Sequence, residues 1–465
     1  MANSLWASPI YKFRLPVDIE ASEGSQLKEI IIDVTGSAPT FDGPSKDLKC
    51  ALEQLFNSNK YKKIQTVLEF GAAKLKNIPY ILKCGKDVTA VEFEKLMENE
   101  ITKATREECE KYGKRFKSIQ FPNPFIFDDK KYDLGLLLNV LPTMPIPAER
   151  LYVLNLLHEK VKNDKYLLWI AFRETREYKD IGEAGTNECG DGIWVHKDWR
   201  YKTFYKYHPL EELDELMGLF GFDKIDITCN EVRLYQKNKY NIMGDLVTPE
   251  RICRYIPENT GIEDPVSVTP KIVEWTSEIK PVIPNPPELQ IENLYIEKLG
   301  QIQHGTKDAE VYHRFVSYAL SRIFRGQLRN MKMKKDIRKG TGIIDTLFLN
   351  SADKGFFHNI KSSQYDCTHP IVEVKNIEGD PENNEINQLY SRFSPQRGNF
   401  GLLICRKIDD PESVLERCAS KAHTGAMLVL CDDDIRRLME YRRDGELENI
   451  DDLMDDKWTD LTYAS

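Results

Sequence analysis

GIIDTLFLN (residues 342–350) and PIVEVKN (370–376) are the two stretches that decide the fold of the last third of the chain. Both are short, rich in β-branched or aromatic residues, and bounded by Gly, Pro or Asn, which is typical of β-strands. Alternate residues of a strand share a face, so Glu373 and Lys375 are expected to point to the same side. Asp345 lies on the preceding strand, and a long hairpin would bring its carboxylate close to that of Glu373.

Two carboxylates and one lysine have the composition of a site that cleaves phosphodiesters. That reaction needs a cation to neutralise charge on the phosphoryl group and a group that positions a water. Mg²⁺, or Mn²⁺ in its place, suits a site of one or two carboxylates, waters and substrate phosphate. Asp345, Glu373 and the carbonyl of Val374 are therefore the predicted metal ligands, with Lys375 beside them. The alternative is a set of solvated charges on an edge strand, because so short a pattern also occurs by chance.

Helical and strand-like segments flank this pattern. KDAEVYHRFVSYALSRIF (307–324) has helical spacing, NNEINQLYSRF (383–393) begins a second helix, and FGLLICRK (400–407) has the composition of a strand. In this order, over about residues 303 to 435, the sequence resembles the PD-(D/E)xK nuclease superfamily and specifically its Mrr-like restriction endonuclease branch.

The resemblance implies an α/β restriction-endonuclease-like fold and adds two catalytic residues. Glu310 in GTKDAE matches the glutamate of the first helix, where it would contact the metal region or its waters. Gln388 matches the glutamine of the helix after the lysine strand, where it would face the site and the substrate backbone. The sequence departs from the family at Ile344, where the first motif usually has proline.

Basic residues lie next to these strands. The stretch RGQLRNMKMKKDIRK (325–339) carries seven basic side chains against one acid. The predicted contacts to nucleic acid are Lys334, Lys335, Arg338, Arg392 and Arg397. A solvated loop or hairpin is the alternative for the stretch, and surface ion pairs are the alternative for the two later arginines.

The first half of the chain alternates strand-like and helical segments, which predicts a parallel sheet covered by helices. The predicted strands are TVLEF (66–70), DVTAVEF (87–93), YDLGLLLNV (132–140) and KYLLWIAF (165–172), and the predicted helices span 99–116 and 148–163. A turn at Gly71 and an acid at Glu92, at the end of the second strand, are typical of a nucleotide site.

Over about residues 50 to 238 this order resembles a class I S-adenosylmethionine-dependent methyltransferase, which has a Rossmann-like fold. The resemblance implies a first cofactor motif at Glu69, Gly71 and Ala73, a ribose clamp at Glu92, and a methyl-transfer pocket flanked by Asp133 and Asn139. No motif identifies a methyl acceptor, and no Pro-Cys dipeptide of the kind that cytosine C5 enzymes use occurs in the chain.

The length and composition of the chain predict its division into domains. A chain of 465 residues predicts two domains, and seven prolines between Pro257 and Pro287 place a linker between them. We therefore expect a methyltransferase-like domain at 1–245, a linker at 246–290 and a nuclease domain at 291–465. The acidic tail from Asp444 onward is expected to be a solvated helix or a frayed end.

The remaining bulk properties exclude several classes of protein. The amino terminus lacks an apolar signal block and no apolar run is long enough to span a membrane, so we expect a cytoplasmic protein without a membrane partner. The ten cysteines form no CxxC pair, which favours reduced core thiols over a zinc site or a disulfide framework.

Together these features predict a metal-dependent nuclease, acting on nucleic acid and in preference DNA, coupled to a methyltransferase-like module. This pairing suggests a restriction-like or antiphage defence role by analogy. The alternative is a catalytically silent module that senses S-adenosylmethionine or a nucleotide and gates the nuclease, which Ala72 and Ala73 favour. A third reading is a scaffold. Cleavage of both strands of a duplex needs two metal centres, which favours a homo-oligomer.

Overall fold

The structure is a computed structural model, and its described residues fall into two compact units. The described residues are 10–17, 26–37, 43–170, 187–189, 192–196, 202–229, 232–252, 255, 272–273, 289–336, 343–365, 367–377, 379–423 and 425–464. Unit 1 comprises Met1–Leu210 and Phe220–Leu289, and unit 2 comprises Glu211–Leu219 and Gln290–Ser465. Each unit has its own sheet and core, so the two are described separately.

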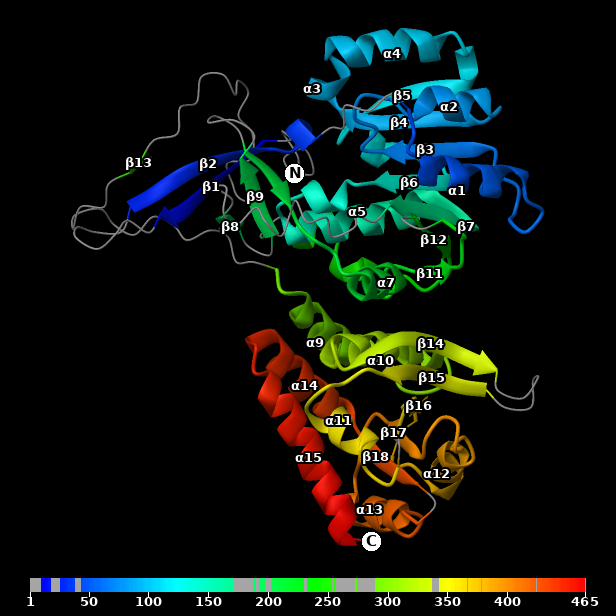
Figure 1. Cartoon of the computed structure of the whole chain (residues 1–465), viewed down its shortest axis with the longest axis vertical. Coiled ribbons are helices and arrows are strands. Elements are labelled where there is room, and N and C mark those ends of the chain that lie inside the picture. Colours follow the sequence, from blue (N-terminus) through cyan, green and yellow to red (C-terminus); the bar gives the residue numbers. More distant parts are fainter. Residues whose placement is uncertain are drawn as a thin grey trace. The chain divides into compact units, whose positions relative to one another are not determined.

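Unit 1 is built on a seven-stranded sheet (Figure 1). The strands are β3 (Thr66–Phe70), β4 (Asp87–Phe93), β5 (Phe116–Phe121), β6 (Tyr132–Leu138), β7 (Val161–Ile170), β11 (Phe222–Ile225) and β12 (Val232–Lys237). They lie in the order β11-β12-β7-β6-β3-β4-β5. The five strands from β7 to β5 run parallel, and β12 is antiparallel to both of its neighbours. The four strands predicted from the sequence are thus confirmed, and they include the centre of this sheet.

Helices bury the seven-stranded sheet of unit 1. They are α1 (Lys46–Asn57), α2 (Ile78–Lys83), α3 (Glu94–Met97), α4 (Glu100–Glu110), α5 (Pro147–Lys160) and α8 (Pro249–Ile252). The α1 helix begins where the Ser45 side chain accepts a hydrogen bond from the N–H of Leu48, as an N-cap does. Leucines and an alanine at helical spacing on α1 pack with α2, α4 and the strands in one core cluster. The β3, β4 and β6 strands are buried on both faces, which explains their nearly continuous apolar sequences.

A second sheet in unit 1 was not predicted from the sequence. It contains β1 (Ile10–Val17), β2 (Gln26–Asp33), β8 (Asn187–Cys189), β9 (Gly192–His196), β10 (Lys202–Tyr205) and β13 (Ile272–Val273). The order is β1-β2-β10-β9-β8, with β13 paired to β2. Most of the pairs are antiparallel, and only β10 and β2 run parallel. Most of the proline-rich segment from 257 to 287 lies outside the described residues.

Unit 2 contains a mixed five-stranded sheet. Its strands, in spatial order, are β14 (Leu328–Asp336), β15 (Ile343–Asn350), β16 (Ile371–Val374), β17 (Phe400–Ile404) and β18 (Ala426–Leu430). β15 is antiparallel to both of its neighbours, β14 and β16, whereas β16, β17 and β18 run parallel. The basic stretch therefore forms most of an edge strand, β14, and β16 is the central strand.

Eight helices among the described residues belong to unit 2. They are α7 (Leu210–Leu219), α9 (Ile291–Gln301), α10 (Ala309–Ile323), α11 (Phe356–Lys361), α12 (Asn383–Tyr390), α13 (Pro411–Ala419), α14 (Asp432–Asp444) and α15 (Leu447–Ala464). The helices predicted at 307–324 and from 383 are confirmed as α10 and α12. The tail is helical, as one of the two expectations had it, but it is neither solvated nor frayed, because α15 buries Leu453 and Met454 and packs the Trp458 ring against those of Phe356 and Tyr365.

Helix α7 takes part in unit 2 through a buried charge cluster. The Glu215 carboxylate is 2% exposed and accepts hydrogen bonds from the Tyr295 hydroxyl at 2.8 Å and from Arg325 at 2.7 Å. Arg322 contacts the same carboxylate at 3.1 Å and Glu292 at 2.6 Å. Each buried charge thus has a counter-charge, which is the condition for tolerating it in a core.

In the part of the chain that the structure describes, no helix is long and apolar enough to cross a membrane.

Candidate functional site

The carboxyl end of β16 is where the predicted catalytic residues of unit 2 meet. The ladder between β15 and β16 consists of the pairs Thr346 with Val372 and Leu347 with Ile371. Beyond it, the N–H of Val374 donates to the Asp345 carboxylate at 3.1 Å instead of to a strand carbonyl. The side chain of Asp345 therefore turns toward β16, as the hairpin prediction required.

Glu373 lies at the centre of a hydrogen-bonded cluster. Its side chain is 1% exposed, and its Oε1 accepts from the Lys375 ammonium at 3.0 Å and from the Gln388 amide at 2.5 Å. The Lys375 ammonium also donates to the Gln388 carbonyl oxygen at 2.9 Å. The structure thus brings together four of the five predicted catalytic residues: Asp345, Glu373, Lys375 and Gln388. The alternative of solvated edge charges is wrong, because β16 is central and Glu373 is buried.

The electrostatics of Glu373 fit a divalent cation. Burial raises the pKa of Glu373 to about 7, the nearby charge of Asp345 acts in the same direction, and the charges of Lys375 and Arg392 oppose them. Its second oxygen, Oε2, is buried without a hydrogen-bond partner. A cation between the two carboxylates would remove their repulsion and supply that partner. Among the described residues no group of three or more His, Cys, Asp or Glu side chains is placed to hold a metal ion.

A buried polar network on α10 holds the strand that carries Asp345. His313 is 6% exposed, and its Nε2 lies 3.0 Å from the Asp345 carbonyl oxygen and 3.2 Å from the Thr346 hydroxyl. The Ser317 hydroxyl donates to the His313 carbonyl at 2.8 Å and lies 2.6 Å from the Thr346 hydroxyl. These contacts were not predicted from the sequence. The regular spacing of His313 and Ser317, four residues apart on one helix, was the signal that could have revealed them.

Glu310 lies on the same helix but has other partners. Its carboxylate pairs with Arg314 at 3.0 Å and with Lys334 of β14. Burial acts to raise the pKa of Glu310, but these two cations outweigh it and hold the pKa below its usual range. Glu310 and Lys334 therefore neutralise each other, and neither is hydrogen-bonded to the cluster around Glu373. The Lys335 side chain and the whole of Arg338 lie outside the described residues.

Two arginines follow α12, and the structure gives them different surroundings. The charge of Arg392 acts on Glu373, which places its guanidinium near the carboxylates. Arg397 donates through Nε and an Nη to the carbonyl oxygen of Arg392, at 3.1 Å and 2.7 Å. Arg397 therefore braces the backbone that carries Arg392.

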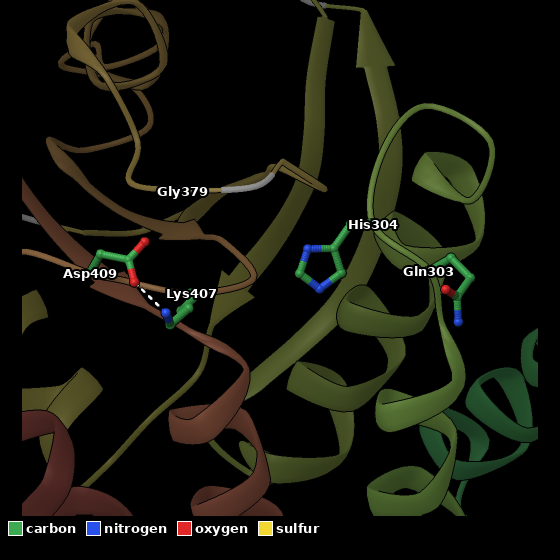
Figure 2. A pocket seen from close by; sticks show the side chains of 5 residues that line it. All are labelled: Gln303, His304, Gly379, Lys407 and Asp409. Atoms are coloured by element: carbon green, nitrogen blue, oxygen red, sulfur yellow. Dashed lines mark ion pairs between the residues drawn. The ribbon is translucent and has the colours of Figure 1, made fainter.

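A pocket of about 450 Å³ opens at the carboxyl ends of the parallel strands, next to the same edge as Lys375. Figure 2 shows Gln303 and His304 on one side of it, and the ion-paired Lys407 and Asp409 across from them. A buried network fixes the loop that carries Gln303. The Asn376 amide donates to the carbonyls of Gln303 and Gly305, at 2.9 Å and 2.8 Å, and Arg406, stacked over Tyr312, donates to Ile302 at 2.9 Å.

In unit 1 the turn after β3 has three residues with left-handed backbone, and only the first of them is glycine. Gly71, Ala73 and Leu75 all have positive φ, at 70°, 48° and 60°. L-residues other than glycine rarely adopt this region. A β-carbon on Gly71 would lie 2.3 Å from Val140, so glycine at this position admits the close approach of a side chain of the protein itself. The Leu75 side chain is fully buried.

The two predicted acids of the cofactor site are close to one another and already bonded. Both oxygens of Glu92 accept backbone hydrogen bonds, from Ala73 at 2.6 Å and from Phe93 at 2.8 Å. Glu69 accepts from the Asn77 amide at 2.6 Å. Burial raises the pKa of Glu69 to about 8 and that of Glu92 to about 7. Both carboxyls are therefore protonated, and so uncharged, in a large fraction of the molecules near neutral pH.

These contacts use part of the hydrogen-bonding capacity of the predicted cofactor motif. The Glu92 carboxylate, the predicted ribose clamp, accepts a hydrogen bond from the N–H of Ala73 in the turn. Val140 lies against Gly71, and Ala73 and Leu75 occupy the two other positions with left-handed backbone. Two acceptors nearby are buried without a hydrogen-bond partner, Glu69 Oε2 and the side-chain oxygen of Asn139. These two oxygens form a polar site beside the turn. The carboxylate of Glu92, by contrast, accepts hydrogen bonds from the backbone through both of its oxygens.

The prediction for Asp133 is wrong. Asp133 lies at the start of β6, whereas Asn139 follows its end, so the two cannot flank one pocket. Its carboxylate accepts from the backbone of Gln65 and Thr66, both at 3.0 Å, and pairs with Lys162 at 3.1 Å. Burial acts to raise the pKa of Asp133, but these partners outweigh it and hold the pKa well below its usual range. Asp133 therefore pins the amino ends of β3 and β6 and has a structural role.

The comparisons with known proteins concern the first part of the chain. No protein-family model matches the sequence, and a search of curated proteins gave no match. The PH0226 protein from Pyrococcus horikoshii OT3 is 15% identical over 41% of this chain and 89% of its own, with a TM-score of 0.32. An S-adenosylmethionine-dependent methyltransferase from Methanosarcina mazei is 15% identical over 38% of this chain and 95% of its own, with a TM-score of 0.31.

A third match is the 1,6-didemethyltoxoflavin-N1-methyltransferase of Burkholderia thailandensis, whose structure contains S-adenosylhomocysteine. It is 18% identical over 37% of this chain and 71% of its own, with a TM-score of 0.28. The chain itself contains a seven-stranded, mainly parallel α/β sheet in unit 1 and a mixed five-stranded sheet in unit 2. At TM-scores below 0.5 these matches carry no conclusion about cofactor, substrate or reaction.

Proposed function

We propose that unit 2 is a metal-dependent nuclease that hydrolyses phosphodiester bonds in nucleic acid, with DNA as the preferred substrate. The observation that carries this proposal is the convergence of Asp345, Glu373, Lys375 and Gln388 at the carboxyl end of a central strand. Burying the Glu373 carboxylate beside a second, half-buried carboxylate is costly unless the cluster has a ligand. A divalent cation and a phosphate are ligands of the right charge.

Each side chain of the cluster has a distinct task in this proposal. Asp345 and Glu373 would hold Mg²⁺ or Mn²⁺, which when bound polarises a water and neutralises charge on the phosphate. The Lys375 ammonium lies 3.0 Å from Glu373 and is therefore placed to orient the attacking water and stabilise the developing negative charge. Gln388 donates to Glu373 and accepts from Lys375, so it fixes the direction of both side chains.

For unit 1 we infer a recognition or regulatory module that does not transfer methyl groups. Two observations support this inference: both oxygens of Glu92 accept backbone hydrogen bonds, and Val140 lies against Gly71. A nuclease controlled by such a module is consistent with a restriction-like or defence role. That role rests on the nuclease proposal and on the coupling of the two units.

Cleavage of plasmid DNA by the full chain tests the proposal. With Mg²⁺ the supercoiled form should convert to nicked and linear forms, and a chelator should stop the conversion. Asp345→Asn and Lys375→Met should each lose cleavage, whereas Asp353→Asn, an exposed acid just after β15, should cut like the wild type. Equal cutting by all four proteins would refute the assignment, and a parallel assay on single-stranded RNA decides the substrate class.

A further inference from the structure

Two cysteines far apart in the sequence are in contact in unit 1. Cys50 lies on α1 and Cys229 in the loop between β11 and β12, 179 residues later. Their Sγ atoms are 2.6 Å apart, and both residues are free cysteines. Two thiols that do not share a covalent bond are normally more than 3 Å apart, as sulfur is a large atom. The backbone here therefore already places the two sulfurs within bonding reach.

Neighbouring side chains hold the two sulfurs in this arrangement. The Gln54 amide, one turn after Cys50, donates to the Cys50 sulfur at 3.3 Å and to the Cys229 sulfur at 3.2 Å. Its carbonyl oxygen accepts from the Thr228 hydroxyl at 2.9 Å. Lys60 reaches the carbonyl of Asp226 at 3.1 Å. The loop is thus tied to Gln54 of α1 and to Lys60 just after the helix, and the contact between the sulfurs is part of that attachment.

We propose that Cys50 and Cys229 are a modification site that closes to a reversible intramolecular disulfide under oxidising conditions. The proposal is independent of the nuclease and concerns residues that no other part of the function uses. In a reducing cytoplasm such a bond would form only transiently, as redox-responsive pairs do there. Its effect is to lock the loop between the last two strands of the sheet onto α1.

The chemistry is thiol–disulfide exchange with a small disulfide oxidant such as oxidised glutathione. Cys50 is half-buried and gives up its proton to water, and its thiolate attacks the oxidant, forming a mixed disulfide and releasing one glutathione thiolate. Cys229 is buried, and burial raises its pKa to about 12, with Cys50 acting in the same direction, so it reacts second. It loses its proton and attacks the Cys50 sulfur, which expels the second glutathione.

The test is peptide mass mapping of the full chain after exposure to oxidised glutathione and blocking of free thiols with an alkylating agent. The expected result is a linked pair of peptides containing positions 50 and 229, two hydrogens lighter than the separate peptides. Dithiothreitol should release the pair completely. Cys50→Ser and Cys229→Ser should each abolish the linked species.

Cys84 provides the internal control, because it is exposed and its thiol is accessible to the oxidant. Under conditions that convert Cys84 to its glutathione adduct, the wild type should show the linked pair as the main form of Cys50. Two results would overturn the proposal. One is a glutathione adduct on Cys50 that persists with Cys229 still alkylated, and the other is full alkylation of both cysteines.

Discussion

The backbone N–H of Val374 donates to the Asp345 carboxylate at 3.1 Å, at the point where the ladder between β15 and β16 has already ended. The bond fixes the position of one acid relative to the strand that carries the other, Glu373. The donor is an uncharged backbone N–H, so it does not neutralise the Asp345 carboxylate, which can still attract a cation. The bond thus holds the Asp345 side chain against β16, and the Asp345 charge is close enough to act on Glu373.

Replacement of Glu373 by glutamine should weaken metal binding. The amide keeps the size of the side chain but removes the charge, and loss of even an indirect partner of a metal ligand costs about tenfold or more in affinity. Titration calorimetry with Mn²⁺ measures the change. Glu412→Gln, an exposed acid on α13, is the matched control and should bind as the wild type does. Unchanged affinity in Glu373→Gln would mean that this carboxylate is not a ligand.

Lys375→Met should reduce the single-turnover cleavage rate by about a hundredfold or more, the loss that follows removal of one donor from a charge-stabilising site. The variant should still fold, because the lysine is on the open side of the cluster and its side chain is 19% exposed. Circular dichroism checks the fold. Gln388→Ala should cause a smaller loss, as Gln388 contacts the metal residues but carries no charge. A Lys375→Met protein that cuts at the wild-type rate would contradict this role.

Asp133→Asn should destabilise unit 1 without any effect on cleavage chemistry. The substitution replaces a buried carboxylate that accepts two backbone hydrogen bonds, and charged hydrogen bonds of this kind contribute about 1.5–3 kcal/mol. Urea unfolding followed by fluorescence measures the free energy. Asp129→Asn, an exposed acid in the loop before β6, should leave it unchanged. Equal stability of the two variants would return Asp133 to the list of candidates for a functional role.

The contribution of Glu69 to the stability of unit 1 should fall as the pH rises from about 5 to about 8. Burial raises the pKa of Glu69 to about 8 in the folded protein from a reference of 4.5, so the folded state keeps a proton that the unfolded state releases in this window. Glu69→Gln cannot lose a proton and should therefore show a flatter dependence of the melting temperature on pH. Glu98→Gln, an exposed acid, should follow the wild type. Parallel curves for all three proteins would show that Glu69 is not protonated.

S-adenosylmethionine should give no binding heat at sub-millimolar concentration. The turn after β3 is closed by Val140 and by the hydrogen bond between Ala73 and Glu92, and opening it would break both contacts. Calorimetry on the full chain measures this directly, with S-adenosylhomocysteine titrated in parallel. A saturable heat from either compound would show that the turn opens, and would restore the sensing or methyl-transfer readings of unit 1.

The strands were predictable from the sequence wherever both faces are buried. TVLEF and PIVEVKN consist largely of apolar residues that the core requires, and the alternation of the second stretch placed Glu373 and Lys375 together. The position of Asp345 followed from the same hairpin. These features depend on local pattern alone, so they could be read before the chain was folded.

Partners that are distant in the sequence could not be predicted in this way. Glu310 was expected at the metal, but Lys334 from an edge strand pairs with it. Asp133 was placed at the wrong end of β6, because an apolar run shows that a strand exists but not where its ends meet the neighbouring strands. The tail was expected to be exposed to solvent because acidic residues dominate its sequence. Leu453 and Met454, which lie at helical spacing from Ile450, are the residues that show its buried face.

The grouping of α7 with unit 2 has a consequence for proteolysis. A protease that cuts in the proline-rich segment would release a carboxy-terminal fragment beginning near Gln290, and that fragment would lack Glu212 and Glu215. Arg322 would then retain Glu292, while Arg325 would lose both carboxylates that the structure gives it. The released fragment would have an incomplete interior, so limited digestion should yield a piece that unfolds or aggregates more readily than the intact chain.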